Sequence, residues 1–306
     1  MTTVRQLIEK ININGAIRFN EPMSLHTSYR IGGPADIYVE PLDLEEFTRV
    51  FLLIKETASP FFLLGGGSNI LVSDRGIRGL VINTANLRHM VIQEDTCSVG
   101  AGMAVSDLAE YLGLSGFGGL ETFYAMPGSL GGAVWMNARC YDVSISEVLQ
   151  EVTLLTPSGE LQTYRVRPED FDYKVSPFQA DHRIIVETTF RLRRDDPAAL
   201  TRRMADIRAD RKKKGHFAYP SAGSVFKNNR SFGKPSGAII DSLGLRGYGV
   251  GKARVSPLHA NFIINEGGAL AEDVRAVIRH VQESVLEAYG YTLEPEVLLV
   301  GEWEVS

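Results

Sequence analysis

Glycine clusters in the first half of the chain constrain the fold more than any other feature. Residues 61–72 read FFLLGGGSNILV, so two short apolar runs flank three consecutive glycines. Short apolar runs bounded by turn residues are typical of strands rather than helices. Residues without a Cβ let the backbone bend sharply and bring its N–H groups close to an anion. The stretch therefore predicts strand–turn–strand, as either an ordinary glycine-rich hairpin or an anion-binding loop.

This motif differs from two common nucleotide-binding loops. No Gly-Lys-Ser/Thr follows the glycines, which excludes a Walker loop. A strand-like run follows them where a Rossmann helix would begin, which argues against that dinucleotide fingerprint. Ser68 and Asn69 instead add side-chain donors and acceptors at this corner.

Three further corners of small residues accompany the first. Residues 29–35 read YRIGGPA, residues 99–102 read VGAG, and residues 126–141 read MPGSLGGAVWMNARCY. Four such corners, separated by apolar runs, suit a long dinucleotide whose pyrophosphate is held by backbone amides. The structural alternative is a β-rich domain with many tight turns.

Apolar spacing predicts the other elements. Helical spacing predicts helices over 44–54, 105–112, 200–214 and 274–285, with Gly290 placed to end the last. Strand-like runs cover 61–64, 70–73, 80–83, 90–93, 152–156, 161–166, 184–190, 250–255, 260–265 and 293–300.

Composition excludes several classes of protein. A chain of 306 residues is long enough for two domains, and its net charge of −5 argues against a general nucleic-acid binder. Two cysteines suggest neither a disulfide framework nor a four-ligand metal site, and the histidines lack metal-ligand spacing. Residues 1–14 hold no continuous apolar segment, and no run of about 18 apolar residues occurs. We expect a cytoplasmic protein without signal peptide, metal or membrane insertion.

Five separated motifs resemble one known family. GGGSNILV, PGSLGGAVWMNA, AGSVFKN, SPLHANFIIN and LEPEV occur in the order typical of UDP-N-acetylenolpyruvoylglucosamine reductases, over residues 24–302. The resemblance implies FAD-dependent reduction of UDP-N-acetylglucosamine enolpyruvate to UDP-N-acetylmuramate with NADPH, in peptidoglycan precursor synthesis. The chain resembles the shorter type of this family, which lacks an extra substrate-clamping tyrosine loop.

The resemblance also implies an α+β fold. Residues 1–200 would form an FAD-binding domain of the vanillyl-alcohol-oxidase/p-cresol-methylhydroxylase type, in two subdomains that meet near residue 85. Residues 201–306 would form an α+β substrate domain, with residues 295–306 returning to the first subdomain. The expected partners are the UDP-sugar and NADPH, bound by a monomer.

The family's binding residues carry over by motif. Those matched to FAD contacts are Tyr29, Arg30, Gly65, Gly66, Gly67, Ser68, Asn69, Ile70, Gly100, Gly102, Pro127, Gly128, Ser129, Gly131, Gly132 and Asn137. Those matched to substrate contacts are Tyr173, Lys227, Asn228 and His259.

Two catalytic residues carry over in the same way. Ser224 would be the general acid that protonates a substrate carbon, although a serine in a glycine-rich loop is more often a turn residue. Glu296 would be an active-site acid, although without the family context it is an ordinary surface carboxylate. Leu298 stands where the family often has arginine, which weakens any ion pair for Glu296.

Lys174 departs from the family. It lies in FDYKVSPF, which aligns with a Tyr-Arg-x-Ser motif whose arginine is catalytic. Lysine keeps the charge but loses the planar fork that binds carboxylates bidentately. Three alternatives stay open: Lys174 acts with looser geometry, another arginine such as Arg183 replaces it, or the activity is altered. Arg139 is a second departure, for which solvent exposure is preferred over pairing with the flavin pyrophosphate.

Two rival functions follow from these departures. One is another flavin oxidoreductase of the same fold, such as an oxidase with tethered FAD. Such oxidases often place a histidine beside the glycine turn, where this chain has Ser68 and Asn69. The other is a non-enzymatic protein that binds flavin or a UDP-sugar as a sensor.

Overall fold

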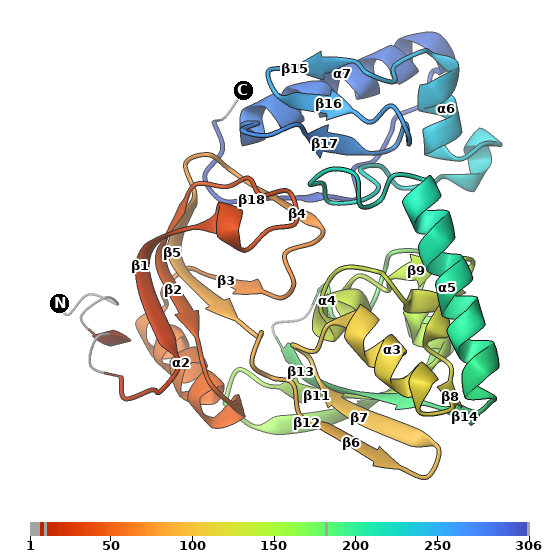
Figure 1. The fold of residues 1–306 in the computed structure, drawn as a ribbon. Helices are drawn as coiled ribbons and strands as arrows, with labels where there is room; N and C mark the ends of the chain where they lie inside the picture. Colours follow the sequence, from red (N-terminus) through yellow and green to blue (C-terminus); the bar gives the residue numbers. More distant parts are fainter. Residues whose placement is uncertain (1–6, 9–10, 181–182, 305–306) are drawn as a thin grey trace. The chain divides into compact units, whose positions relative to one another are not determined.

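The computed structural model describes residues 7–8, 11–180 and 183–304 of an α+β protein (Figure 1). Internal contacts divide the chain into two compact units. Unit 1 comprises residues 1–19, 37–66 and 79–209, and unit 2 comprises residues 20–36, 67–78 and 210–306. Each unit therefore combines segments that are distant in sequence.

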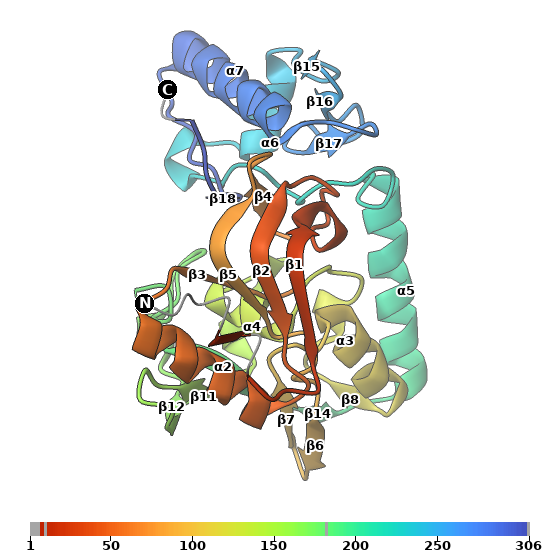
Figure 2. The ribbon, with the colours of Figure 1, turned by 90° about the vertical axis from the view of Figure 1, so that its left-hand side faces the viewer.

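The first sheet has the strand order β1-β2-β5-β3. Its strands are β1 (Ala16–Pro22), β2 (Pro34–Glu40), β3 (Phe61–Leu64) and β5 (Ile77–Asn83). Helix α2 (Leu44–Thr57) begins at Asp43, whose carboxylate accepts the N–H of Glu46, and ends at Ala58 in left-handed conformation. Its apolar face packs in unit 1 against residues of β2 and β5, including Val39 and Leu80 (Figure 2).

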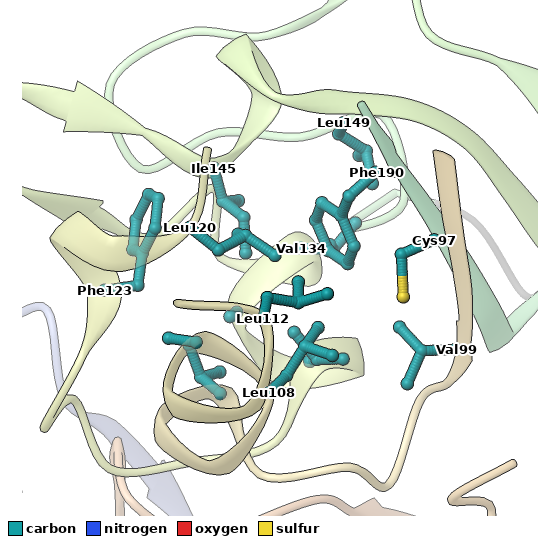
Figure 3. Close-up of a cluster of buried hydrophobic side chains, with 14 of the residues drawn as sticks. Cys97, Val99, Leu108, Leu112, Leu120, Phe123, Val134, Ile145, Leu149 and Phe190 are labelled. Atoms are coloured by element: carbon teal, nitrogen blue, oxygen red, sulfur yellow. The ribbon is translucent and has the colours of Figure 1, made fainter. Parts of the chain in front are cut away.

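The second sheet, within unit 1, is antiparallel. Its order is β12 (Leu161–Arg165), β11 (Leu149–Leu155), β13 (Ile184–Arg191), β7 (Thr96–Gly100) and β6 (Met90–Gln93). Helices α3 (Val105–Leu114) and α4 (Leu130–Trp135) share a core with it. Figure 3 shows Leu108 and Leu112 of α3 close to Val134 and Phe190 in this core. Each such side chain stabilises the fold by about 1.5–3 kcal/mol on burial.

Helix α5 (Pro197–Lys213) follows the second sheet along the chain (Figure 1). Its Met204 packs in the same core. A Cβ on Gly113 of α3 would lie 2.6 Å from the Met204 methyl group, so these helices approach closely. Two short antiparallel pairs complete unit 1: β8 (Phe117–Gly118) with β14 (Arg193–Arg194), and β9 (Arg139–Cys140) with β10 (Val143–Ser144).

Unit 2 has a small antiparallel sheet, β15 (Gly249–Val250), β16 (Ala253–Val255) and β17 (Ile263–Asn265). Helix α7 (Ala271–Tyr289) packs against all three strands, and α6 (Ser236–Ser242) contacts α7. The first N–H groups of α7 donate to the Asp74 carboxylate, at 2.8 and 3.1 Å. Strand β4 (Ile70–Val72) pairs in parallel with β18 (Leu298–Val300).

Most elements predicted from the sequence are confirmed, including all four helices and the left-handed cap at Gly290. The glycine motif is strand–turn–strand as predicted, but its hairpin alternative is wrong, because β3 pairs with β5 and β4 with β18. The single strand expected over residues 250–255 is also wrong: these residues contribute to two strands, because Gly251 turns the chain at φ +53°. Residues 130–135, for which no element was predicted, form helix α4.

Glu46 anchors the start of unit 1 to α2. Its buried carboxylate accepts the N–H groups of Asn14 (2.5 Å), Gly15 (3.0 Å) and Leu42 (2.8 Å). Burial raises the pKa of this carboxyl, but the three N–H donors and Arg49 outweigh it and hold the pKa below its usual range. Because the pKa of Glu46 is lower in the folded protein than its ordinary value of about 4.5, the ionised carboxylate stabilises the fold above pH 4.5. This stabilisation is lost as the pH falls through the folded-state pKa.

We therefore expect Glu46→Gln to lower the free energy of unfolding by about 1–3 kcal/mol at pH 7, because buried donors lose a charged acceptor. The loss should shrink as pH falls below about 4.5, since the unfolded wild-type chain then binds a proton at this carboxyl and the folded protein follows at lower pH. Urea unfolding between pH 3 and 7 measures both effects. The neighbouring Glu45→Gln, at an exposed carboxylate, is the control. Equal stability losses in both variants at pH 7 would contradict the assignment.

Candidate functional site

Three of the predicted glycine corners meet within unit 1. The Gly66 N–H donates to Ser129 Oγ at 3.2 Å. The Leu130 N–H donates to the Met103 carbonyl at 2.9 Å, and the Gly131 N–H to the Ala101 carbonyl at 2.8 Å. Residues 65–66, 100–103 and 127–132 thus form one cluster, which we call the glycine cluster.

The backbones in the glycine cluster are too close for side chains. A Cβ on Gly66 would lie 2.7 Å from the Gly128 Cα, and a Cβ on Gly102 would lie 1.9 Å from the Thr84 carbonyl oxygen. Gly66 and Gly132 are nevertheless exposed. The cluster therefore presents bare main chain to the outside of unit 1.

The residues of the glycine cluster fit the FAD that the sequence motifs imply. Backbone without side chains lets a pyrophosphate approach the main chain closely, although the N–H groups of Gly66 and Gly132 both donate to Ser129 Oγ here. None of these residues carries an acidic side chain that would repel the anion. Ser129 also caps α4 by accepting the N–H of Gly132.

The fourth corner lies in unit 2. The Ser28 N–H donates to the Gly67 carbonyl at 3.0 Å, so residues 28–30 lie beside the end of the glycine motif. Arg30 is exposed and has a φ of +54°. Tyr29 is fully buried, and its hydroxyl has no hydrogen-bond partner among the described residues. Burial raises the pKa of the Tyr29 hydroxyl, which therefore stays protonated.

Ser224 lies at the start of an extended segment that is paired on both edges. On one side Ser224 bridges to Phe262, and the Val225 N–H donates to the Asn261 carbonyl at 2.8 Å. On the other side the Glu296 N–H donates to the Val225 carbonyl at 2.7 Å. The two predicted catalytic residues of unit 2, Ser224 and Glu296, therefore lie on hydrogen-bonded neighbouring segments.

Asn69 connects the glycine motif to the segment of Glu296. Its Nδ2 donates to the Glu296 carbonyl at 3.1 Å, and its own carbonyl accepts the Leu298 N–H at 3.1 Å. Ile70 then pairs with Leu298 at the start of β4 and β18. The Glu296 side chain is buried, with 9% exposure.

The predicted substrate residues of unit 2 have distinct partners. Lys227 pairs with the Glu294 carboxylate. Asn228 Oδ1 accepts the N–H of Ser236, the first residue of α6, at 2.9 Å. His259 Nδ1 accepts the Asn261 N–H at 3.3 Å. Burial, followed by Arg246 and Lys214, lowers the pKa of His259, which keeps the imidazole neutral. 

Lys174 lies at the tip of a tight turn in unit 1. Asp172 and Val175 exchange backbone hydrogen bonds of 3.2 and 3.0 Å, which leaves Tyr173 and Lys174 between them. Lys174 has a φ of +60° and is half-buried, whereas Tyr173 is exposed. A non-glycine residue in this region costs roughly 1–2 kcal/mol, so surrounding contacts must hold it.

Those contacts tie the turn to the end of α4. Asn137 Nδ2 donates to the Asp172 carbonyl at 2.8 Å. Gln179 Nε2 donates to the carbonyls of Lys174 (3.0 Å) and Trp135 (3.1 Å). Asn137, predicted only as a cofactor residue, thus also positions the predicted catalytic turn.

The arginines considered as substitutes for Lys174 have other partners. Arg183 donates to Gln162 Oε1 at 3.0 Å on the second sheet. Arg139 donates to Ser144 Oγ at 3.2 Å and pairs with Asp142 at 3.3 Å. These contacts support Lys174 as the cation of the turn.

Sequence reasoning missed two residues that hold the site together. Asn261 is buried, and its side chain accepts the Phe226 N–H at 3.0 Å and donates to the Phe226 carbonyl at 2.8 Å. A polar residue inside the apolar run HANFIIN was the available signal. Gln179 gave no such signal, because its partners are carbonyl groups fixed by the fold.

Two kinds of feature are absent from residues 7–8, 11–180 and 183–304. These residues contain no cluster of three or more His, Cys, Asp or Glu side chains suited to a metal ion. None of the helices among them combines the length and the apolar character that a membrane span requires.

The close approach at Gly66 predicts a steric effect on stability. Gly66→Ala should lower the unfolding free energy of the flavin-free protein by about 1–3 kcal/mol, because the new Cβ overlaps Gly128. Gly132→Ala is the matched control, since its nearest neighbour would be Ser129 Oγ at an ordinary 3.4 Å. Thermal unfolding of both apoproteins measures the difference. A Gly66→Ala apoprotein as stable as wild type would disprove the close approach.

Two protein-family models match most of the chain. Residues 35–165 match a family model described as an FAD binding domain. Residues 215–300 match the model of the C-terminal domain of UDP-N-acetylenolpyruvoylglucosamine reductase.

Relatives and a solved structure extend the match over nearly the whole chain. The reductase of that name from Treponema denticola is 41% identical, with 94% of this chain and 95% of the relative covered. The one from Halalkalibacterium halodurans is 38% identical, with 98% and 100% covered. The crystal structure of the Thermus caldophilus reductase superposes with a TM-score of 0.79 at 30% identity, covering 94% of this chain and 100% of that one. The chain belongs to the UDP-N-acetylenolpyruvoylglucosamine reductase family.

Proposed function

We propose that this protein reduces UDP-N-acetylglucosamine enolpyruvate to UDP-N-acetylmuramate with NADPH and FAD, as a step of peptidoglycan precursor synthesis. Family membership over nearly the full chain supports this reaction. The FAD-domain match and the bare backbone of the glycine cluster support the flavin. The observation that carries the assignment is the pairing of the Ser224 segment with the Glu296 segment, which places the two family-matched residues on hydrogen-bonded neighbouring segments.

Bound FAD supplies hydride transfer from NADPH, and the residues of this chain supply binding, charge and a proton. Ser224 Oγ would donate its proton to the inner carbon of the enolpyruvyl double bond after hydride reaches the terminal carbon. A serine hydroxyl is a weak acid, so this step requires a strongly basic carbon and good alignment. Pairing on both edges fixes the Ser224 backbone and supports that alignment.

Lys174 and Glu296 would act on the negative charge that develops on the substrate. Lys174 would offset the negative charge that develops on the substrate carboxylate as an enolate-like species forms, as a point charge in place of a guanidinium. Glu296 is buried beside the Ser224 segment, where as an active-site acid it would support charge development at the substrate carboxylate or enol. Lys227 and Asn228 would contact the UDP portion, and Tyr173 and His259 would line the substrate site.

The cofactor would be held by the four glycine corners, including Gly65, Gly67, Ser68, Gly100 and Gly128. We further infer a cytoplasmic monomer. The FAD-binding domain would extend to about residue 200 and the substrate domain from 201 to 306.

Two measurements test the function. Purified protein should contain FAD that is released on denaturation. NADPH oxidation should depend on the enolpyruvyl substrate and yield UDP-N-acetylmuramate. Flavin binding without turnover would favour the non-enzymatic sensor, and turnover of other substrates alone would favour a different flavin oxidoreductase.

Ser224→Ala should separate the two half-reactions. Flavin reduction by NADPH should stay near the wild-type rate, whereas substrate reduction should slow by roughly 10²–10⁴, the usual effect of a positioned acid. Stopped-flow absorbance of the flavin measures each step. Ser221→Ala, in the same loop, should leave both steps unchanged. Equal losses in both half-reactions of Ser224→Ala would indicate a structural role.

Lys174 should be the functional cation of its turn. Lys174→Ala should slow flavin reoxidation by substrate roughly 10²–10³-fold, comparable to removal of one preorganised charge-stabilising group. Lys174→Arg should keep measurable activity, because the charge remains. Arg183→Ala is the control and should react like wild type. If Lys174→Ala reoxidises at the wild-type rate while Arg183→Ala is slow, the assignment moves to Arg183.

A further inference from the structure

His216 belongs to an aromatic cluster beside the Ser224 segment of unit 2. Its ring meets the Phe262 ring edge-on, with 4.7 Å between centroids. His259 packs on Phe262 at 4.3 Å, and the two imidazoles are 6.1 Å apart. Phe262 bridges to Ser224, and side chains of bridged residues share one face of a sheet. Sequence motifs single out His259 and Ser224 but not His216.

Hydrogen bonds define which imidazole nitrogen carries the proton. Asn261 donates its backbone N–H to His259 Nδ1 at 3.3 Å. Arg211, whose guanidinium only donates, places an N–H 3.5 Å from His216 Nδ1. A neutral imidazole that accepts at Nδ1 must carry its proton at Nε2. Both rings therefore have Nε2–H donors.

The charges around the pair keep both rings neutral. Burial, followed by Arg211, His259 and Lys214, lowers the pKa of His216 to about 4, against the opposing effect of Asp210. Burial, followed by Arg246 and Lys214, also lowers the pKa of His259, opposed by a hydrogen bond to its own backbone. Arg246 is itself paired with Asp241, and Lys214 with Asp210. His216 and His259 are therefore both influenced by cationic side chains from more than one segment.

We propose that His216 is a positioning residue that holds His259 in its neutral, Nε2–H form beside Phe262, ready to donate to a phosphate oxygen of the substrate. The inference rests on the substrate role proposed for His259. His216 acts by filling the space next to His259, which excludes water and prevents rotation of the ring. A fixed neutral donor also binds a phosphate group similarly over the pH range in which a free histidine would change charge.

Nuclear magnetic resonance of the free holoenzyme tests the positioning without turnover. With ¹⁵N-labelled histidine, His259 should appear as the Nε2–H tautomer, with a titration midpoint below about 6.5. His216→Ala should raise that midpoint toward about 6.5, because water reaches the ring. His216→Phe should keep it low, because the aromatic packing is restored. His89→Phe, at an exposed histidine of unit 1, is the control for loss of one imidazole signal.

Steady-state kinetics with the UDP-sugar substrate give the second readout. His216→Ala should raise KM roughly three- to tenfold near pH 8, consistent with loss of about one well-placed hydrogen bond. Its kcat should stay close to wild type, and KM should become pH-dependent between pH 5.5 and 7.5. His216→Phe should recover most of the wild-type KM.

Three results would overturn the inference. They are an Nδ1–H tautomer of His259 in wild type, an unchanged His259 midpoint in folded His216→Ala, or a low kcat with unchanged KM. If His216→Ala does not fold, the tautomer of His259 in wild type and the titration midpoint of His259 in His216→Phe still test the inference. A His259→Ala variant with wild-type KM would instead refute the substrate role of His259, whatever the resonance data show.

Discussion

Main chain packed directly on main chain is the constraint on which unit 1 depends. At Gly66 and Gly128 the backbones are so close that a single methyl group would overlap. The contact joins a loop after β3 to the loop before α4, and Ser129 secures it with a hydrogen bond. Because Gly66 remains exposed, the requirement for glycine there serves both the fold and access by an anionic ligand.

Local patterns in the sequence were sufficient to predict most helices and strands and to identify the residues that lie in family motifs. Apolar spacing predicted α2, α3, α5 and α7, because each buries one face against a sheet or helix. Spacing did not predict strand partners: the two runs around the glycines pair with β5 and β18 rather than with each other. Such pairings join segments that are distant in sequence: Ile70 pairs with Leu298, 228 residues further along the chain. A local sequence pattern does not encode such a contact.

Carboxamide side chains provide much of what the sequence could not predict. Asn69, Asn137 and Asn261 each hold a loop that carries a candidate site residue. A carboxamide can donate and accept at once, as a backbone peptide does, so it can join a strand edge or a turn without a regular ladder. The sequence marks Asn69 and Asn137 only as cofactor residues and Asn261 only as a polar residue in an apolar run, whereas their hydrogen-bond partners identify all three as connectors.

The left-handed turn at Lys174 has a consequence for how this position can vary. Glycine or asparagine would relieve the backbone conformation observed there, since both tolerate positive φ. Either would also remove the only side-chain charge that the turn tip carries between Asp172 and Val175. Selection for thermal stability alone would therefore favour replacing this lysine. Under the role proposed for Lys174, selection for turnover would retain it, so stability and activity would be opposed at position 174.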